Sequence, residues 1–187
     1  MKRILPFLLL LGSFVVAQER DGIGDFWQIQ AGVAKAVAID PSLDGRMGHF
    51  LELRWDFPFG GRQDCQARAG LSSIDGRDAP LEYVPASIQR SKVSTLYTGI
   101  NYRVRFLRGD WTPFFVVGLF RGSIDYTRNV RGPAASESAN LQSTENGLNL
   151  GLGFRLGKRF ELEARVQAFG NDAFNASAFM FGLAYRL

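Results

Sequence analysis

One small group of residues has the side-chain types needed for acyl transfer. His49 is the only histidine, and Ser72, Ser73 and Asp75 lie where the next alternating segment ends. A histidine base activates a serine hydroxyl as a nucleophile, and a carboxylate orients that base. Only the counting of segments brings these residues together, and no serine stands two residues after His49. Because a polar histidine at a strand end is usually a rim residue, we predict no catalytic residue.

A larger set of charged residues alternates with apolar residues along several segments. Alternate side chains of a strand lie on one face, so each of these runs would present its charges to a single side. If that side is the interior of a closed barrel, the charges gather at one level and must pair, because unpaired buried charges are very costly. The predicted interior network consists of Glu52, Arg54, Asp56, Arg68, Arg103, Arg105, Arg155, Glu161, Glu163 and Arg165.

Two interpretations of this network are open. It is either a plug or gate in a passage, or the ion-paired core of a filled barrel. We favour the filled core, because an interior of eight strands is only just wide enough for side chains. A change such as Arg105→Ala or Glu163→Ala should then destabilise the protein by leaving partners unpaired.

The composition argues against several other functions. With one histidine and one cysteine, Cys65, the chain offers no metal-ligand cluster and no intrachain disulfide. The glycines from Gly147 to Gly153 sit on an alternating segment, so they do not form a phosphate-binding loop, and we expect no cofactor. The net charge of +4 includes Lys2 and Arg3 of the N-terminal segment. No basic stripe with aromatic partners is visible, so nucleic acid is not an expected partner.

These residues must be positioned by β-strands, because eight alternating segments follow one another without any long helical periodicity. Their lengths suit tilted strands that cross a membrane. Long and short connections alternate between them, as in an up-and-down barrel, and residues 127–145 form the longest predicted loop, which we expect to be solvated and mobile. The predicted strands are 26–37, 49–57, 65–74, 92–106, 112–126, 147–156, 160–168 and 179–187.

The N-terminus has the features of a secretory signal peptide. Lys2 and Arg3 precede an apolar run from Ile4 to Leu11, and Val15-Val16-Ala17 offers small residues for cleavage. We therefore predict a signal peptide over residues 1–17 and one barrel domain over residues 18–187. No stretch of 18 apolar residues follows, so a membrane location would require a barrel.

Aromatic residues decide which face of the barrel is outside. They collect on the apolar face at the end with the short turns, where a bilayer interface places amphipathic rings. A soluble lipocalin-type barrel, with the apolar face inside, is the alternative. The predicted membrane-interface aromatics are Trp27, Trp55, Phe57, Tyr102, Phe106, Trp111, Phe160 and Tyr185.

The last segment carries a resemblance to a known group. Phe179, Phe181, Leu183, Tyr185 and Leu187 alternate up to the final residue. With the signal peptide and the eight segments, this pattern resembles the small eight-stranded outer-membrane β-barrels of the OmpA, OmpX and OmpW-like groups. The expected fold is thus an all-β, eight-stranded antiparallel up-and-down transmembrane barrel.

The resemblance implies a location in a bacterial outer membrane. It also implies contact with outer-membrane lipids and lipopolysaccharide, and insertion by the barrel assembly machinery. We expect a non-enzymatic protein with a structural or surface-interaction role through its extracellular loops, whose partner the sequence does not identify. A narrow channel for small or apolar solutes is an alternative, for which Phe114, Val116 and Phe120 are the only hint. A further alternative is a lipid A-modifying acyl hydrolase or transferase using His49.

Overall fold

The computed structural model describes residues 27–37, 40–60, 62–81, 84, 86–107, 111–133, 136–169 and 177–187. The predicted signal peptide lies outside these residues. In the described part the chain forms nine strands: β1 (Trp27–Val37), β2 (Met47–Gly60), β3 (Gln63–Asp75), β4 (Ala79–Pro80), β5 (Ile88–Arg105), β6 (Trp111–Arg131), β7 (Ser136–Leu156), β8 (Phe160–Phe169) and β9 (Ser177–Arg186). No helix in this part is long and apolar enough to cross a membrane.

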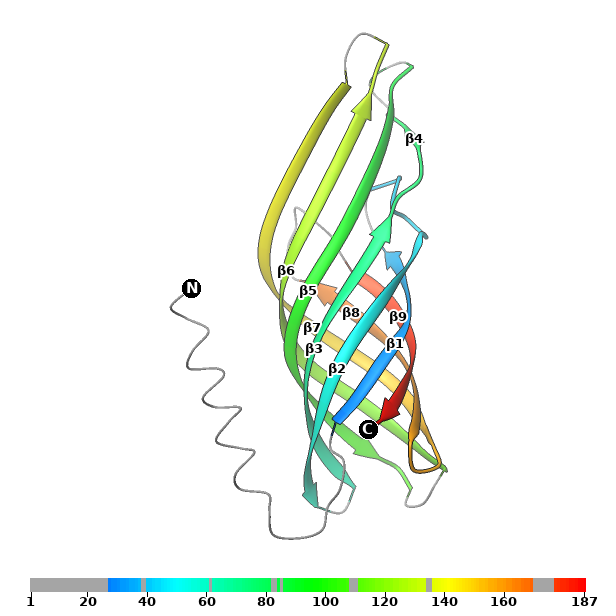
Figure 1. The fold of residues 1–187 in the computed structure, drawn as a ribbon, viewed down its shortest axis with the longest axis vertical. Helices are drawn as coiled ribbons and strands as arrows, with labels where there is room; N and C mark the ends of the chain where they lie inside the picture. Colours follow the sequence, from blue (N-terminus) through cyan, green and yellow to red (C-terminus); the bar gives the residue numbers. More distant parts are fainter. Residues whose placement is uncertain are drawn as a thin grey trace.

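Eight of these strands close into an antiparallel barrel. Consecutive barrel strands pair with each other, and β1 pairs with β9. The short β4 is outside this series: β3 pairs directly with β5, and β4 pairs only with β5. Figure 1 shows the tilted strands wrapping around one axis, with β1 beside β9. Closure satisfies the backbone of the first and last strands, so the expected fold class and all eight predicted strands are confirmed.

Three connections between the predicted strands differ from the sequence prediction. Residues 127–145 are not a loop, because β6 continues to Arg131 and β7 begins at Ser136, in register with it. Ala79 and Pro80, expected within a loop, form β4 against Gln89 and Ile88. The turn predicted at 58–61 begins later, since β2 reaches Gly60 after a register shift. The tight turn predicted at 108–110 and residues 171–175 of the predicted last long connection lie outside the described residues.

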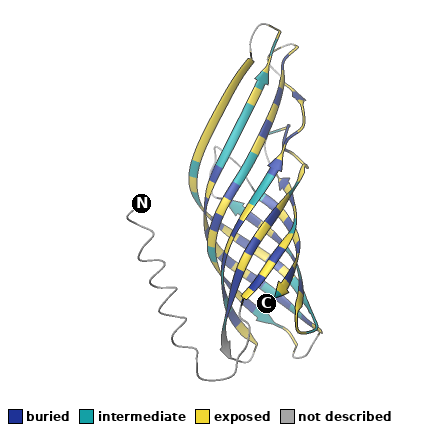
Figure 2. Ribbon diagram, viewed as in Figure 1, coloured by how far each residue is buried: buried dark blue, intermediate teal, exposed yellow. Residues whose placement is uncertain are grey.

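Alternation controls burial along the strands within the barrel wall. β9, for example, is buried and exposed at alternate positions, with Phe179, Phe181 and Leu183 exposed at 45, 48 and 46% and Met180 at 1%. Figure 2 shows the resulting chequered pattern of buried and exposed residues around the barrel. The large apolar side chains thus face outward and the polar and small ones inward, which is the reverse of a soluble barrel.

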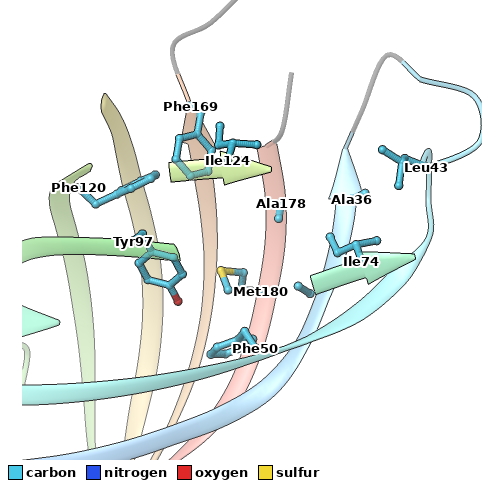
Figure 3. Packing of buried hydrophobic residues seen from close by; sticks show 11 residues of the cluster. Ala36, Leu43, Phe50, Ile74, Tyr97, Phe120, Ile124, Phe169, Ala178 and Met180 are labelled. Atoms are coloured by element: carbon cyan, nitrogen blue, oxygen red, sulfur yellow. The ribbon is translucent and has the colours of Figure 1, made fainter. Parts of the chain in front are cut away.

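The half of the interior farther from the short turns, called the upper half, holds an apolar layer. Phe120 lies edge-on to Phe169 with ring centroids 4.7 Å apart, and Tyr97 approaches Phe120 at 6.1 Å. Figure 3 shows these rings with Phe50, Ile74, Met180 and other members of the cluster pointing into the barrel. This layer fills the barrel above the charged residues described next.

Candidate functional site

A charged cluster fills the interior near the short turns. Arg103 is its centre, with its guanidinium 2.8 Å from Asp56, 3.0 Å from Asp64 and 2.7 Å from Glu161. Arg105 pairs with Asp64 at 2.6 Å, and Arg155 with Glu161 at 3.0 Å. Arg186 adds contacts of 3.2 Å to Asp56 and 3.5 Å to Glu161. These seven residues, from six strands, form the lower cluster.

The upper cluster lies directly above it. Arg54 reaches across the barrel to Glu163, with two hydrogen bonds of 3.0 and 2.9 Å, and also contacts Glu52 at 2.6 Å. Arg165 pairs with both Glu52 and Glu163. Arg68 lies 3.3 Å from Glu52 and 3.6 Å from Glu163. The Tyr97 hydroxyl donates to Glu52 at 2.7 Å, which ties this cluster to the apolar layer.

The structure brings all ten residues of the predicted network into ion pairs. Sequence reasoning missed two members, Asp64 and Arg186. Both had a usable signal, because Asp64 shares the face of Arg68, and Arg186 shares the face of Ala184, opposite Tyr185. Asp64 was overlooked because the third strand was predicted to begin at Cys65, two residues after its start at Gln63.

Side chains occupy the barrel at the level of these clusters. Arg54 and Arg103 are 0 and 1% exposed, and Gln28, Gln30 and Asn101 are fully buried. A water-filled lumen would expose the side chains that line it. Phe114, Val116 and Phe120, the only hint of an apolar passage, are also buried, and the ring of Phe114 lies 5.2 Å from the Arg103 guanidinium. Within the described residues, these side chains therefore pack the interior as a core.

The connection after β1 covers the opposite end of the barrel. Leu43, 2% exposed, belongs to the apolar cluster of the interior. Asp40 anchors this turn, because its carboxylate accepts hydrogen bonds from the Ser91 hydroxyl and the Tyr126 hydroxyl, both at 2.6 Å, and from Gln89 at 3.0 Å. Burial raises the pKa of Asp40, but the hydrogen bonds from Ser91, Tyr126 and Ser42 outweigh it and hold the pKa below its ordinary value. The turn is thus fixed to two strands on the far side of the mouth.

The eight predicted interface aromatics all belong to the short-turn end of the barrel. Trp27 stacks on Trp55 at 5.2 Å, and Trp55 contacts Phe57 at 4.6 Å. Phe160 contacts Tyr185 at 5.3 Å, and the Tyr185 hydroxyl accepts from Arg159 at 2.9 Å. The remaining three aromatics lie on the outside and are 39–67% exposed; they are Tyr102, Phe106 and Trp111.

The His49 group is not assembled as a catalytic triad. His49 and Ser73 are register partners, whereas Ser72 pairs with Phe50 and so lies on the other face of β3. The Ser73 hydroxyl is 3.4 Å from that of Ser94, and Asp75 pairs with Lys92 at 3.5 Å. Among the described residues, His49 has no side-chain hydrogen bond to a serine or a carboxylate. The same part of the chain has no group of three histidine, cysteine or acidic side chains placed to hold a metal ion.

A three-stranded sheet projects beyond the barrel at the end opposite the short turns. Its strands are the upper parts of β5, β6 and β7 (Figure 1). The pairing of β5 with β6 continues up to the partners Ile88 and Arg131, and the pairing of β6 with β7 continues up to the partners Arg131 and Ser136. β4 covers the edge of β5 at Gln89. Among the described residues the other edge has no strand partner above Gly147, where the pairing of β8 with β7 ends. Within the described residues, β7 residues 136–144 pair on one side only.

Comparisons with solved structures identify the fold. Ail, the attachment invasion locus protein of Yersinia pestis, superposes with a TM-score of 0.58 over 88% of this chain and 100% of its own, at 17% sequence identity. Neisserial surface protein A gives a TM-score of 0.50 over 86% of this chain and 97% of its own, at 14% identity. No protein-family model and no curated protein matches the sequence. The chain therefore has the fold of the small eight-stranded outer-membrane barrels that its sequence resembles.

Proposed function

We propose that this chain is a non-enzymatic protein of a bacterial outer membrane that binds extended polypeptide on its projecting sheet. Residues 1–17 act as the signal peptide and residues 18–187 form the barrel domain, which the barrel assembly machinery inserts. The observation that carries the proposal is the open edge of β7, residues 136–144, held above a barrel whose interior is filled.

The outer surface supports the membrane location. On seven strands the outward residues are apolar from the aromatic level up to a polar residue near the rim, with Thr98 on β5 as the exception. The distance from Trp27 to Lys35, or from Trp111 to Arg121, is about 20–25 Å along the axis at a rise of ~3.3 Å per residue and a tilt of ~40°. That height matches the apolar band of an outer-membrane barrel. The first polar outward residues are Lys35, His49, Ser73, Ser94, Arg121, Asn146 and Ser177.

The filled interior argues against the channel alternative. Ion pairs and aromatic rings occupy successive levels, and Leu43 covers the mouth. We expect the protein in planar bilayers to give no stepwise conductance. Discrete, reproducible steps would contradict the packed interior.

An unpaired strand edge recruits another strand through main-chain hydrogen bonds. The protein covers the β5 edge with β4, which carries Pro80, yet leaves the β7 edge exposed over nine consecutive residues, 136–144. Ail is named for attachment, and a contact role of the same general kind suits a sheet held away from the membrane. The partner class is a polypeptide segment without stable structure of its own.

A shortened hairpin tests the proposal. Thr127 and Asn140 are register partners, so replacing residues 128–139 with Asn-Gly removes the outer part of the projecting sheet, including residues 136–139 of the open edge, and keeps the pairs below it. A control replaces only residues 132–135 with Asn-Gly and retains the open edge. A random-peptide display library is selected on wild-type protein in nanodiscs. We expect the enriched peptides to bind the control as they bind wild type and to bind the shortened variant more weakly, because it keeps only residues 140–144 of the open edge.

Two outcomes would contradict the proposal. Peptides that bind all three proteins equally would place the contact elsewhere on the chain. Failure of the chain to reach the surface of intact cells, judged by its protection from added protease, would refute the location.

A further inference from the structure

The inner face of the projecting sheet, which continues the interior of the barrel, carries an apolar row that stops at the open edge. Val93 on β5, Tyr126 on β6 and Leu141 on β7 are consecutive register partners, so their side chains are neighbours across the sheet. Val93 and Tyr126 are partly buried against the apolar cluster of the interior. Leu141, the last member of the row, is 48% exposed. An added strand with an apolar side chain opposite Leu141 would continue the row and cover this residue.

An acidic side chain lies four residues before Leu141 on the same face. Glu137 is exposed and is the register partner of Val130. The cation of the adjacent inner-face row, Arg128, donates to the side chain of Gln89 at 2.5 Å. No ion pair of Glu137 occurs in the part of the chain that the structure describes. A basic side chain on an added strand would therefore meet an unpaired carboxylate at this position.

The outer face of the open edge is polar and uncharged. Its side chains are those of Ser136, Ser138, Asn140, Gln142 and Thr144. Hydroxyl and amide groups of this kind accept small polar neighbours on the next strand. The inner face, with one exposed apolar and one acidic side chain, therefore determines which segments fit the edge.

The order of these two side chains also sets the direction of the bound segment. Antiparallel pairing is slightly more stable per residue than parallel pairing. In an antiparallel partner, the residue opposite Leu141 comes four positions before the residue opposite Glu137. The favoured segment thus carries an apolar residue and, four residues later, a lysine or arginine. A parallel partner would carry the same two residues in the reverse order.

A second copy of the same edge does not meet this requirement. Residues 136–144 contain no lysine or arginine, so no register between two β7 edges supplies a cation to Glu137. In the symmetric register about Asn140, Glu137 would face Ser143, and Leu141 would face the small Ala139. The segment that fits the edge therefore belongs to a different polypeptide.

We propose that the open edge of β7 selects polypeptide segments in which an apolar residue, placed against Leu141, is followed four residues later by a basic residue, placed against Glu137. This inference rests on the proposed function, because it specifies which extended polypeptides the edge binds. The unfinished apolar row and the unpaired carboxylate carry it. Each exposed cross-strand pair of this kind changes affinity by about two- to fivefold. The two positions together therefore provide the selectivity.

The test uses the full barrel in nanodiscs and a fluorescent, threonine-rich peptide of nine residues. Phenylalanine at peptide position 4 and lysine at position 8 lie opposite Leu141 and Glu137 in the antiparallel register. Binding is measured by fluorescence anisotropy, and the gel shift on heating verifies that each variant is folded. A second peptide has the phenylalanine and the lysine exchanged, which keeps composition and charge. We expect it to bind more weakly than the first.

Variants of the barrel test each contact. Glu137→Gln and Leu141→Ser should each weaken binding about two- to fivefold. Their effects should multiply in the double variant, because residues four apart on a strand are about 13 Å apart and act independently. The controls Asp125→Asn and Ile88→Ser remove an acidic and an exposed apolar side chain from the outer face of the same sheet. They should change binding less than about 1.5-fold.

Salt and charge reversal separate the two contacts. In about 1 M salt the effect of Glu137→Gln should disappear, because exposed charges are screened, whereas the effect of Leu141→Ser should remain. Glu137→Lys should weaken the lysine peptide further and should restore binding of a peptide with glutamate at position 8. Replacing the peptide phenylalanine with serine repeats the Leu141 test without any change in the barrel.

The inference and the proposed function fail in different ways. Equal binding of the two peptides, or unchanged affinity in both Glu137→Gln and Leu141→Ser, would overturn the inference. So would selected peptides that bind the edge without the pattern while the designed peptide does not bind. Strand addition itself is tested by N-methylating either the even or the odd amides of the peptide, since one set must then abolish binding. If neither does, or if the shortened hairpin binds the peptide as well as its control, the proposed function fails.

Discussion

Replacing Glu163 with glutamine should strongly destabilise the barrel. Glu163 and Glu52 are the two carboxylates of the upper cluster, facing the three guanidiniums of Arg54, Arg68 and Arg165. The cluster therefore carries 3 − 2 = +1. The substitution keeps the shape of the side chain and raises the charge to 3 − 1 = +2, in side chains that are 0–1% exposed.

The magnitude follows from this burial. Removing one partner of a buried pair costs about 3–5 kcal/mol, because the remaining charge stays desolvated. The control is Asp75→Asn, which breaks a pair with Lys92 whose side chains are 59 and 53% exposed. An exposed pair of this kind contributes about 0–1 kcal/mol. The free energy of unfolding is measured by urea titration in lipid vesicles, with tryptophan fluorescence and the gel shift as separate probes.

A double variant separates charge imbalance from lost packing. Adding Arg68→Gln to Glu163→Gln returns the cluster to 2 − 1 = +1, and Arg68 has the longest contacts in it, 3.3 and 3.6 Å. The double variant should be more stable than Glu163→Gln alone. The reasoning is refuted if Glu163→Gln costs no more than Asp75→Asn, or if the second change lowers stability further.

Three other changes test the mouth, the packing and the absence of catalysis. Asp40→Asn should accelerate amide exchange in the turn after β1. The folded-state pKa of Asp40 is lowered. The stability that Asp40 gives to the turn is therefore present above the ordinary aspartate pKa and is lost as pH falls through the folded-state pKa. Amide exchange in the wild-type turn should approach that of the variant only in acid. Gly70→Ala would place a Cβ 2.7 Å from the ring and hydroxyl of Tyr97. It should cost about 1–3 kcal/mol in urea unfolding. His49→Asn should leave the mass spectrum of cellular lipid A unchanged, and an altered acylation pattern would contradict the non-enzymatic assignment.

The alternating pattern was sufficient to predict the barrel strands and most of the inward charges, because a two-residue period fixes the face of each side chain. It was not sufficient to predict their partners. Arg54 and Arg68 are direct register partners on β2 and β3, which considered alone predicts repulsion. Two carboxylates stabilise both: Glu52, two residues before Arg54 on β2, and Glu163, on β8 and 109 residues from Arg54 along the chain. Such a pairing depends on the tilt and stagger of the closed barrel, which no local pattern contains.

The projecting sheet was missed for a different physical reason. A strand is recognisable in sequence when one face is apolar, but residues 136–146 of β7 are almost entirely exposed on both faces, as Figure 2 shows. Their strand conformation comes from a continuous register with β6, which extends to the pair Arg131 and Ser136. Burial supplies little of the stability here, so the main-chain bonds to β6 must hold the strand extended. Within the described residues, this part of β7 is held extended by β6 and has no partner on its other edge. Its backbone is therefore already ordered before a partner binds. This lowers the entropic cost of binding an extended polypeptide at that edge.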